Sequence, residues 1–358
     1  MSTPWILYGA NGYTGALIAE RAAAEGLRPV LAGRNGPAVA KLAGRLGLEH
    51  RVFDLADADA TARNLEGAAL VLHTAGPFSA TSAPMLDACM RARVHYLDIT
   101  GEIAVFEACK ARDAEARGRG VIVLPGVGFD VVPSDCLARA LAEALPGAVR
   151  LELAFMALGS LSRGTMKTMI EHLGEGAQVR RGGTLETIPA GSLIRTVELG
   201  GKPRKALAIG WGDVSTAQHS TGIQDITVYM VIPPGQLRGL KVLGLLGPLL
   251  RRPTVIRLLQ AIVGRTVHGP DESVRESAHA ELWAHVTAVD GRSVEGRLRT
   301  PESYKTTVLT ALACVRRTLA DAPEAGYHTP SSAFGAGLVR TLPGFELEVG
   351  PVRAPAGG

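Results

Sequence analysis

The chain has 358 residues, of which 46% are hydrophobic and 20% charged, with a formal net charge of +4. This length predicts two domains, and this balance excludes an intrinsically disordered protein. The arginines are scattered rather than gathered on one arm, so no nucleic-acid partner is expected. The four cysteines lack the spacing of a zinc site. We therefore expect no metal, free structural thiols and a cytoplasmic location.

Short strand and helix patterns alternate through the first part of the chain. The strand candidates are Trp5–Tyr8, Pro29–Ala32, Arg51–Phe53, Ala69–His73, Tyr96–Ile99 and Val121–Leu124. Helical spacing lies between them, at Tyr13–Glu25, from Val39 to Leu46, at Pro84–Arg93 and at Val105–Arg117. This alternation is typical of βαβ units. It predicts an α/β protein whose N-terminal domain, residues 1–146, holds a parallel sheet of the Rossmann type.

The pattern changes near Pro146. Later strand candidates are longer and alternate between apolar and polar residues, as in Ile223–Ile232 and His279–Val289. Alternation indicates a sheet covered on one face, so we expect a second α+β domain with a mixed sheet over residues 147–300. Residues 301–358 are predicted to form a C-terminal helix and tail that return to the first domain. Helices are expected at Thr165–Leu173, within 240–263 and at Tyr304–Leu319.

A glycine-rich turn follows the first strand and opens the first helix. Its residues are Gly9, Ala10, Asn11, Gly12, Tyr13, Thr14 and Gly15. Glycines let a backbone bend and approach a pyrophosphate, and the helix start offers free N–H groups with a positive dipole end. The turn is therefore predicted to bind a dinucleotide. The alternative is a glycine-rich turn with no ligand.

Arg34 ends the second strand at the place where an NAD-binding domain carries an acid. Because a guanidinium can fork onto a 2′-phosphate, Arg34 favours NADP as the cofactor. Asp54 follows the third strand, where a carboxylate can reach the adenine amino group, although a turn residue is an equal interpretation. The small residues after the fourth strand allow close approach to the middle of the cofactor. They are Thr74, Ala75, Gly76 and Pro77.

Three residues are candidates for proton transfer. Asp130 lies after a predicted strand, where a carboxylate can act as a general acid. Asp213 and His219 fall in the densest polar stretch of the second domain. Imidazole titrates near neutral pH, so His219 could protonate a substrate after hydride transfer. Helix capping and ordinary loop contacts are the alternatives for all three.

An apolar stripe with flanking arginines lies within residues 240–263. A basic amphipathic helix of this kind can lie on a membrane surface or cover an acyl chain. A core helix or a homodimer contact uses the same residues. Peripheral membrane contact and a homodimer are therefore both open interpretations.

Taken together, these motifs resemble the saccharopine dehydrogenase-like oxidoreductases, and within them the branch that includes trans-acting enoyl reductases of lipid and polyketide synthesis. The resemblance rests on Tyr8–Gly15, Ala32–Arg34, Gly76–Phe78, Tyr96–Asp98 with Gly101 and Glu102, and Gly128–Asp135, and later on Gly164-Thr165, Trp211–Val214, Ser220–Ile223 and Tyr327–Pro330. It implies a Rossmann NADP domain, a mixed-sheet substrate domain and a C-terminal segment that returns to the first domain.

The sequence thus predicts an NADPH-dependent oxidoreductase that reduces an apolar or acyl-type substrate, by enoyl reduction. An imine-type, saccharopine-like amino-acid dehydrogenase is one alternative. A non-catalytic NADP-binding adaptor for a membrane or a partner is another. The short-chain dehydrogenases are excluded, because no tyrosine is followed by lysine four residues later.

Overall fold

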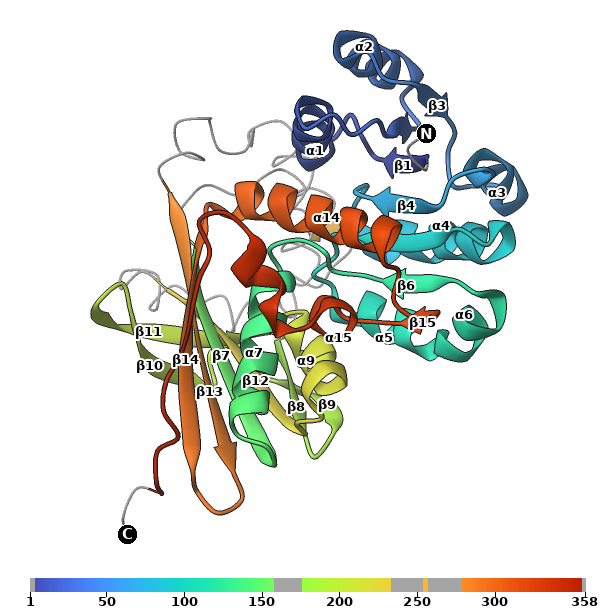
Figure 1. Ribbon diagram of the computed structural model, residues 1–358. Helices are drawn as coiled ribbons and strands as arrows, with labels where there is room; N and C mark the ends of the chain where they lie inside the picture. Colours follow the sequence, from blue (N-terminus) through green and yellow to red (C-terminus); the bar gives the residue numbers. More distant parts are fainter. Residues whose placement is uncertain (1–3, 158–175, 233–253, 257–277, 356–358) are drawn as a thin grey trace. The chain divides into compact units, whose positions relative to one another are not determined.

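The computed structural model describes residues 4–157, 176–232, 254–256 and 278–355, and Figure 1 shows their helices and strands. By their contacts the residues divide into two compact units. Unit 1 comprises Met1–Val132 and Tyr304–Phe334, and unit 2 comprises Pro133–Ser303 and Gly335–Gly358. The chain therefore passes between the units three times. The domain bounds at residues 146 and 300 stay predictions.

Unit 1 contains one sheet of seven parallel strands, in the order β15-β6-β5-β4-β1-β2-β3. The order reverses between β1 and β4, which is where ligands bind in open α/β sheets. Every residue of β1, β2 and β4 is buried. The predicted Rossmann-type parallel sheet is confirmed. Its strands are β1 Trp5–Tyr8, β2 Val30–Gly33, β3 His50–Val52, β4 Leu70–His73, β5 His95–Asp98, β6 Ile122–Leu124 and β15 Gly326–Tyr327.

The helices of unit 1 pack against this sheet (Figure 1). They are α1 Tyr13–Ala24, α2 Gly36–Leu46, α3 Ala58–Leu65, α4 Phe78–Ala92, α5 Ile103–Ala111, α6 Asp113–Arg119, α14 Ser303–Ala320 and α15 Pro330–Phe334. Helix α3 was not predicted from the sequence, and two of the predicted helices differ in their bounds. The helix expected at Val105–Arg117 divides into α5 and α6 at Arg112. Helix α4 begins six residues before Pro84, because a distant carboxylate caps its first N–H groups.

Unit 2 contains a mixed sheet, as predicted, and nine of its strands lie in the described residues. Its main path runs β10-β11-β12-β7-β13-β14-β16, while β8 pairs with β12 and β9. Among the described strands, β7 and β12 pair in parallel and the other pairs are antiparallel. The strands are β7 Ala148–Ala157, β8 Ala177–Arg181, β9 Thr184–Ile188, β10 Ile194–Leu199, β11 Lys202–Ile209, β12 Asp225–Val231, β13 His279–Ala288, β14 Ser293–Pro301 and β16 Glu346–Val349.

In the described residues, the helical segments of unit 2 include α7 Val132–Ala144, α9 Asp213–Thr221 and the 3₁₀ helix η1 Ala336–Thr341. The helix predicted at Thr165–Leu173 lies outside the described residues, and so does all of 240–263 except 254–256. The membrane and dimer interpretations of that stripe therefore stay predictions. Within the described ranges, no helix combines the length and hydropathy needed to span a bilayer.

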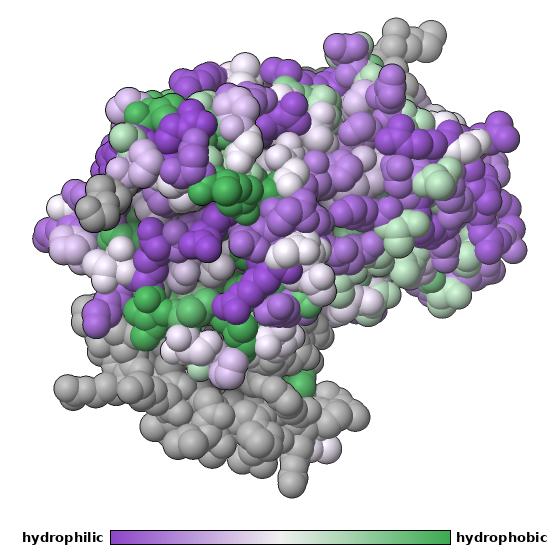
Figure 2. Space-filling model, turned by 90° about the horizontal axis from the view of Figure 1, so that it is seen from below, coloured by the Kyte–Doolittle hydropathy of each residue, from purple (hydrophilic) through white to green (hydrophobic). Residues whose placement is uncertain are grey.

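Large hydrophobic side chains are seldom exposed in the part of the chain that the structure describes. Val289 at 84% and Val52 at 49% are among the few. On the face drawn in Figure 2, hydrophobic residues lie in small groups between hydrophilic ones. Scattered apolar residues of this kind are normal on a protein surface and indicate no binding site by themselves.

Candidate functional site

The turn between β1 and α1 is a tight loop of backbone. Gly9 has a φ of +83°. Its N–H and that of Ala10 both donate to the carbonyl oxygen of Ala32, over 2.8 and 3.1 Å. The N–H of Gly12 donates to the carbonyl oxygen of Gly9 over 2.9 Å. A side-chain carbon at Gly15 would lie 2.3 Å from that same oxygen, so the fold of the turn requires Gly15.

The seven predicted residues of this turn differ in exposure. Asn11 and Gly12 are exposed, and Tyr13 and Thr14 are half-buried. The others, Gly9, Ala10 and Gly15, are buried. A ligand that approaches from solvent therefore meets the backbone around Asn11 and Gly12, while the buried glycines shape that backbone.

The start of α1 is open to an anion. Gly12 stands at its N-cap and makes no side-chain capping bond. The starts of the next three helices are capped: Asn35 caps α2, Asp57 caps α3 and Glu102 accepts the first two N–H groups of α4. Uncapped N–H groups at a helix start bind anions. Of helices α1 to α4, α1 is thus the one suited to a pyrophosphate.

The charges of Arg34 and Asp54 both affect the pKa of the Tyr8 hydroxyl. That hydroxyl donates to the carbonyl oxygen of Phe53 over 3.3 Å. Burial raises the pKa of Tyr8 to about 12, the Asp54 charge adds to this rise, and the Arg34 charge opposes it. The ends of β1, β2 and β3 therefore bring an exposed cation and an exposed anion to one place. This is the edge at which an adenosine lies in Rossmann domains.

Asp54 also has a local structural role. Its Oδ1 accepts the N–H of Ala56 over 3.0 Å, and its carbonyl oxygen accepts the hydroxyl of Thr61 over 3.1 Å. These bonds form the turn that leads into α3. The turn-residue interpretation is thus correct for Asp54, and its contact with adenine stays a prediction.

The loop after β4 lies against the glycine turn. The hydroxyl of Thr74 donates to the carbonyl oxygen of Tyr8 over 2.9 Å. A carbon added at Gly9 would lie 2.8 Å from the backbone nitrogen of Ala75. Gly76 is exposed, and Pro77 is the N-cap residue of α4. The structure therefore brings the predicted loop Thr74–Pro77 to the turn that follows β1.

Asp98 ties the ends of β5 and β6 together. Its Oδ1 accepts the N–H groups of Thr100 and Gly126, each over 2.9 Å, and its Oδ2 accepts the hydroxyl of Tyr96. The side chain is fully buried. Burial raises the pKa of Asp98 to about 6, while these hydrogen bonds lower it and the neighbouring Glu102 charge raises it.

Glu102 holds the start of α4. Its Oε1 accepts the N–H of Phe78 over 2.9 Å, and its Oε2 accepts the N–H of Ser79 over 2.7 Å. A buried carboxylate with two such bonds stabilises the helix start and fixes the loop before it. Sequence reasoning did not assign this role, because Glu102 follows α4 in the chain and no local pattern links the two.

Asp130 lies in the loop after β6, within unit 1. It is half-buried, and burial raises its pKa to about 7. A side-chain carbon added at Gly101 would lie 2.6 Å from its Oδ2, so the carboxylate rests against the loop after β5. Of the three candidate acids, Asp130 is the one in the same unit as the glycine turn.

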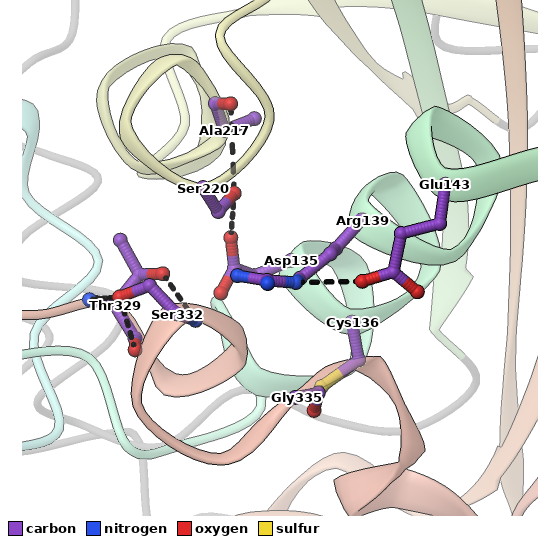
Figure 3. A network of polar contacts seen from close by, with 9 residues as sticks. All are labelled: Asp135, Cys136, Arg139, Glu143, Ala217, Ser220, Thr329, Ser332 and Gly335. Carbon is purple, nitrogen blue, oxygen red and sulfur yellow. Dashed lines mark hydrogen bonds and ion pairs between the residues drawn. The ribbon is translucent and has the colours of Figure 1, made fainter. Parts of the chain in front are cut away.

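Asp213 and His219 lie on α9 in unit 2. Asp213 is fully buried in the first turn of the helix, and His219 is exposed near its end. Figure 3 shows a neighbouring contact, in which the Ser220 hydroxyl donates to Oδ1 of Asp135 over 2.6 Å. Asp135 lies inside α7, which begins at Val132. A catalytic role for Asp213 or His219 stays a prediction.

Three comparisons relate the chain to known proteins. Residues 5–124 match the family described as the saccharopine dehydrogenase NADP binding domain. A trans-acting enoyl reductase of Mycobacterium leprae is 34% identical over 138 residues, which are 36% of this chain and 33% of the relative. A putative trans-acting enoyl reductase of Mycobacterium tuberculosis is 32% identical over 182 residues, 47% of this chain and 43% of the relative. The chain thus matches less than half the length of these relatives.

Among solved structures, the apo saccharopine dehydrogenase (L-Glu forming) of Saccharomyces cerevisiae is similar to the chain. The TM-score is 0.66 at 10% identity, with 97% of this chain and 100% of that chain covered. This likeness is one of fold. Residues 5–124, with their parallel strands and glycine turn, are thus similar to the saccharopine dehydrogenase NADP binding domain.

Proposed function

We propose that the protein is an NADPH-dependent oxidoreductase that reduces an apolar or acyl-type substrate, by enoyl reduction. The cofactor assignment rests on one observation. At the carboxyl edge of the parallel sheet, the start of α1 has no side-chain cap from Gly12, and the exposed Arg34 follows the neighbouring strand β2. The names of the similar mycobacterial proteins support the substrate class.

The residues of unit 1 fit NADPH. The N–H groups at the start of α1 would hold the pyrophosphate, because the N-cap residue Gly12 makes no side-chain capping bond to them. Arg34 would pair with the 2′-phosphate as a charge-assisted fork, and Asp54 would receive the adenine amino group. The backbone of Thr74–Pro77 would border the nicotinamide half, since this loop lies against the glycine turn.

When bound, NADPH supplies the hydride. Reduction of an enoyl group also needs a proton at the carbon beside the carbonyl. Asp130 would donate that proton and recover it from solvent. Since its pKa is about 7, a substantial fraction is protonated near neutral pH, as a general acid requires.

The test is NADPH oxidation with enoyl thioesters of increasing chain length, compared with keto acids in the presence of an amino donor. We expect turnover of the thioesters and better rates with longer chains. Asp130→Asn should lower kcat by about 10²-fold or more, the range expected for loss of a general acid. Asp321→Asn, which changes an exposed acid of the same unit, is the matched control. Turnover confined to keto acids with an amino donor would instead identify an amino-acid dehydrogenase.

A further inference from the structure

Helix α14 lies along the whole of α1. The ring of Tyr304, at the start of α14, packs edge-to-face on Tyr13 at the start of α1, with centroids 5.0 Å apart and planes at 83°. Near the other end, Arg316 forms an ion pair with Glu25, the C-cap residue of α1. The two contacts are twelve residues apart along α1 and also twelve residues apart along α14. The two helices therefore run side by side in the same direction for about 18 Å.

The first turn of α14 also supports the loop after β6. The hydroxyl oxygen of Thr307 accepts the N–H of Phe129 over 3.1 Å. A carbon added at Gly128 would lie 3.2 Å from Cγ2 of Thr307. Tyr304 and Thr307 are three residues apart, so they share one face of the helix. One helical turn thus touches both the glycine turn and the loop that carries Asp130.

We propose that Tyr304 and Thr307 are positioning residues for the dinucleotide, Tyr304 for the pyrophosphate end and Thr307 for the end where Asp130 lies. This inference rests on the proposed function. Tyr13 is the first residue of α1, so the packing of its ring orients the open helix start. Both supporting side chains are buried, at 7% exposure for Tyr304 and 8% for Thr307.

The physical reason is preorganisation. When the Tyr304 ring is absent, Tyr13 and the N–H groups beside it have more freedom, and binding must remove that freedom. When Thr307 no longer accepts the N–H of Phe129, the neighbouring Asp130 loses its fixed place. Misplacement of a reacting group lowers the rate of chemistry more than the affinity for cofactor.

The two residues therefore predict different kinetic effects. Tyr304→Leu should weaken NADPH and NADH binding by the same factor, about fivefold, as expected for the loss of an aromatic pair. The preference for NADPH, which depends on Arg34, should not change. Thr307→Val should lower kcat and shift the pH dependence of kcat while leaving the NADPH dissociation constant within about twofold.

The experiment measures NADPH and NADH dissociation constants by fluorescence titration of the full chain, and kcat against pH. Tyr304→Phe and Thr307→Ser keep the ring and the hydroxyl, so both should restore wild-type values. A double-mutant cycle with Tyr13→Leu should show that the two losses are not additive. If circular dichroism melting shows that Tyr304→Leu does not fold, Tyr13→Leu removes the same ring contact from the other side and should weaken NADPH and NADH binding by the same factor.

Two failures are distinguishable. If wild-type protein does not bind NADPH, the proposed function is wrong. If wild-type protein binds NADPH but Tyr304→Leu binds it equally well, or if the losses at Tyr13 and Tyr304 are additive, the positioning role is wrong and the proposed function stands. An unchanged pH dependence in Thr307→Val would overturn the assignment of Thr307.

Discussion

The hydroxyl of Tyr96 donates to Oδ2 of Asp98 over 2.5 Å, and both side chains are fully buried in unit 1. The pair is asymmetric. Burial raises the pKa of both groups, but the Asp98 value of about 6 lies within the range of ordinary buffers and that of Tyr96 does not. Asp98 is therefore the group whose titration couples to folding.

The pKa of Asp98 predicts a loss of stability as pH rises. An unfolded aspartic acid has a pKa of about 3.9. Between that value and about 6, the folded chain binds the proton more tightly, so the free energy of unfolding falls as pH rises through this window. The fall should be roughly 1–3 kcal/mol. Asp98→Asn should flatten this part of the profile in urea unfolding, and Asp321→Asn should leave it unchanged.

His73 predicts the opposite dependence of the free energy of unfolding on pH. It is fully buried on β4, and burial lowers its pKa to about 3. Because the unfolded imidazole has a pKa of about 6.5, the unfolded chain binds the extra proton between these values, and stability is lost as pH falls. His73→Gln should remove this acid-side loss. A wild-type profile is expected to be nearly level where the two slopes overlap, and a steep profile unaffected by either substitution would contradict both assignments.

The glycine turn predicts two separable effects. Gly12→Ala should weaken NADPH binding strongly with a small change in the free energy of unfolding, since its new carbon lies 3.1 Å from one carbonyl oxygen. Gly15→Ala should destabilise the fold itself, because its carbon would lie 2.3 Å from the same oxygen. Gly44→Ala is the control: nothing lies within 4 Å, so it should stabilise α2 by roughly 0.5–1 kcal/mol. Normal NADPH binding by Gly12→Ala would move the pyrophosphate elsewhere.

Arg34 predicts the cofactor preference. Arg34→Ala should weaken NADPH binding by roughly 1–3 kcal/mol and leave NADH binding nearly unchanged. Arg34→Lys keeps the positive charge but loses the forked guanidinium, so its NADPH affinity should lie between those of the wild type and Arg34→Ala. Lys41→Ala, an exposed cation on α2, controls for general charge. Calorimetric titration with both cofactors measures the effect, and equal losses for NADPH and NADH would mean that Arg34 does not read the 2′-phosphate.

Local patterns were sufficient for much of this fold. The short apolar runs that became β1, β2 and β4 are buried strands, as their alternation with helices predicts. The longer alternating runs became β12 and β13 within one or two residues of their predicted ends. Periodicity reports which face of an element is apolar, so it identifies elements that depend on their own sequence.

Contacts between distant residues were not predictable in this way. Glu102 caps α4 from 24 residues further along the chain, which moves the start of that helix to Phe78. The ring of Tyr304 packs on the ring of Tyr13, although the two residues are far apart in the sequence. Each interaction depends on where the fold brings a side chain, and no repeating pattern encodes it. The hydrogen bonds made by the buried acids Asp98 and Glu102 were therefore not predicted, although the segments that carry these residues were singled out in the sequence.

The last strand of the nucleotide-binding sheet has a consequence for the order in which the protein is made. Strand β15 pairs with β6, and the Tyr327 N–H donates to Asp113 over 2.7 Å. A ribosome synthesises β6 long before it reaches residue 326. One edge of β6 therefore stays unpaired in the nascent sheet while the strands of unit 2 are synthesised. Open edges invite pairing with other chains, and non-local closure is slow. Synthesis of Gly326 and Tyr327, rather than of the segment that ends with β6, is thus the step that completes the nucleotide-binding sheet.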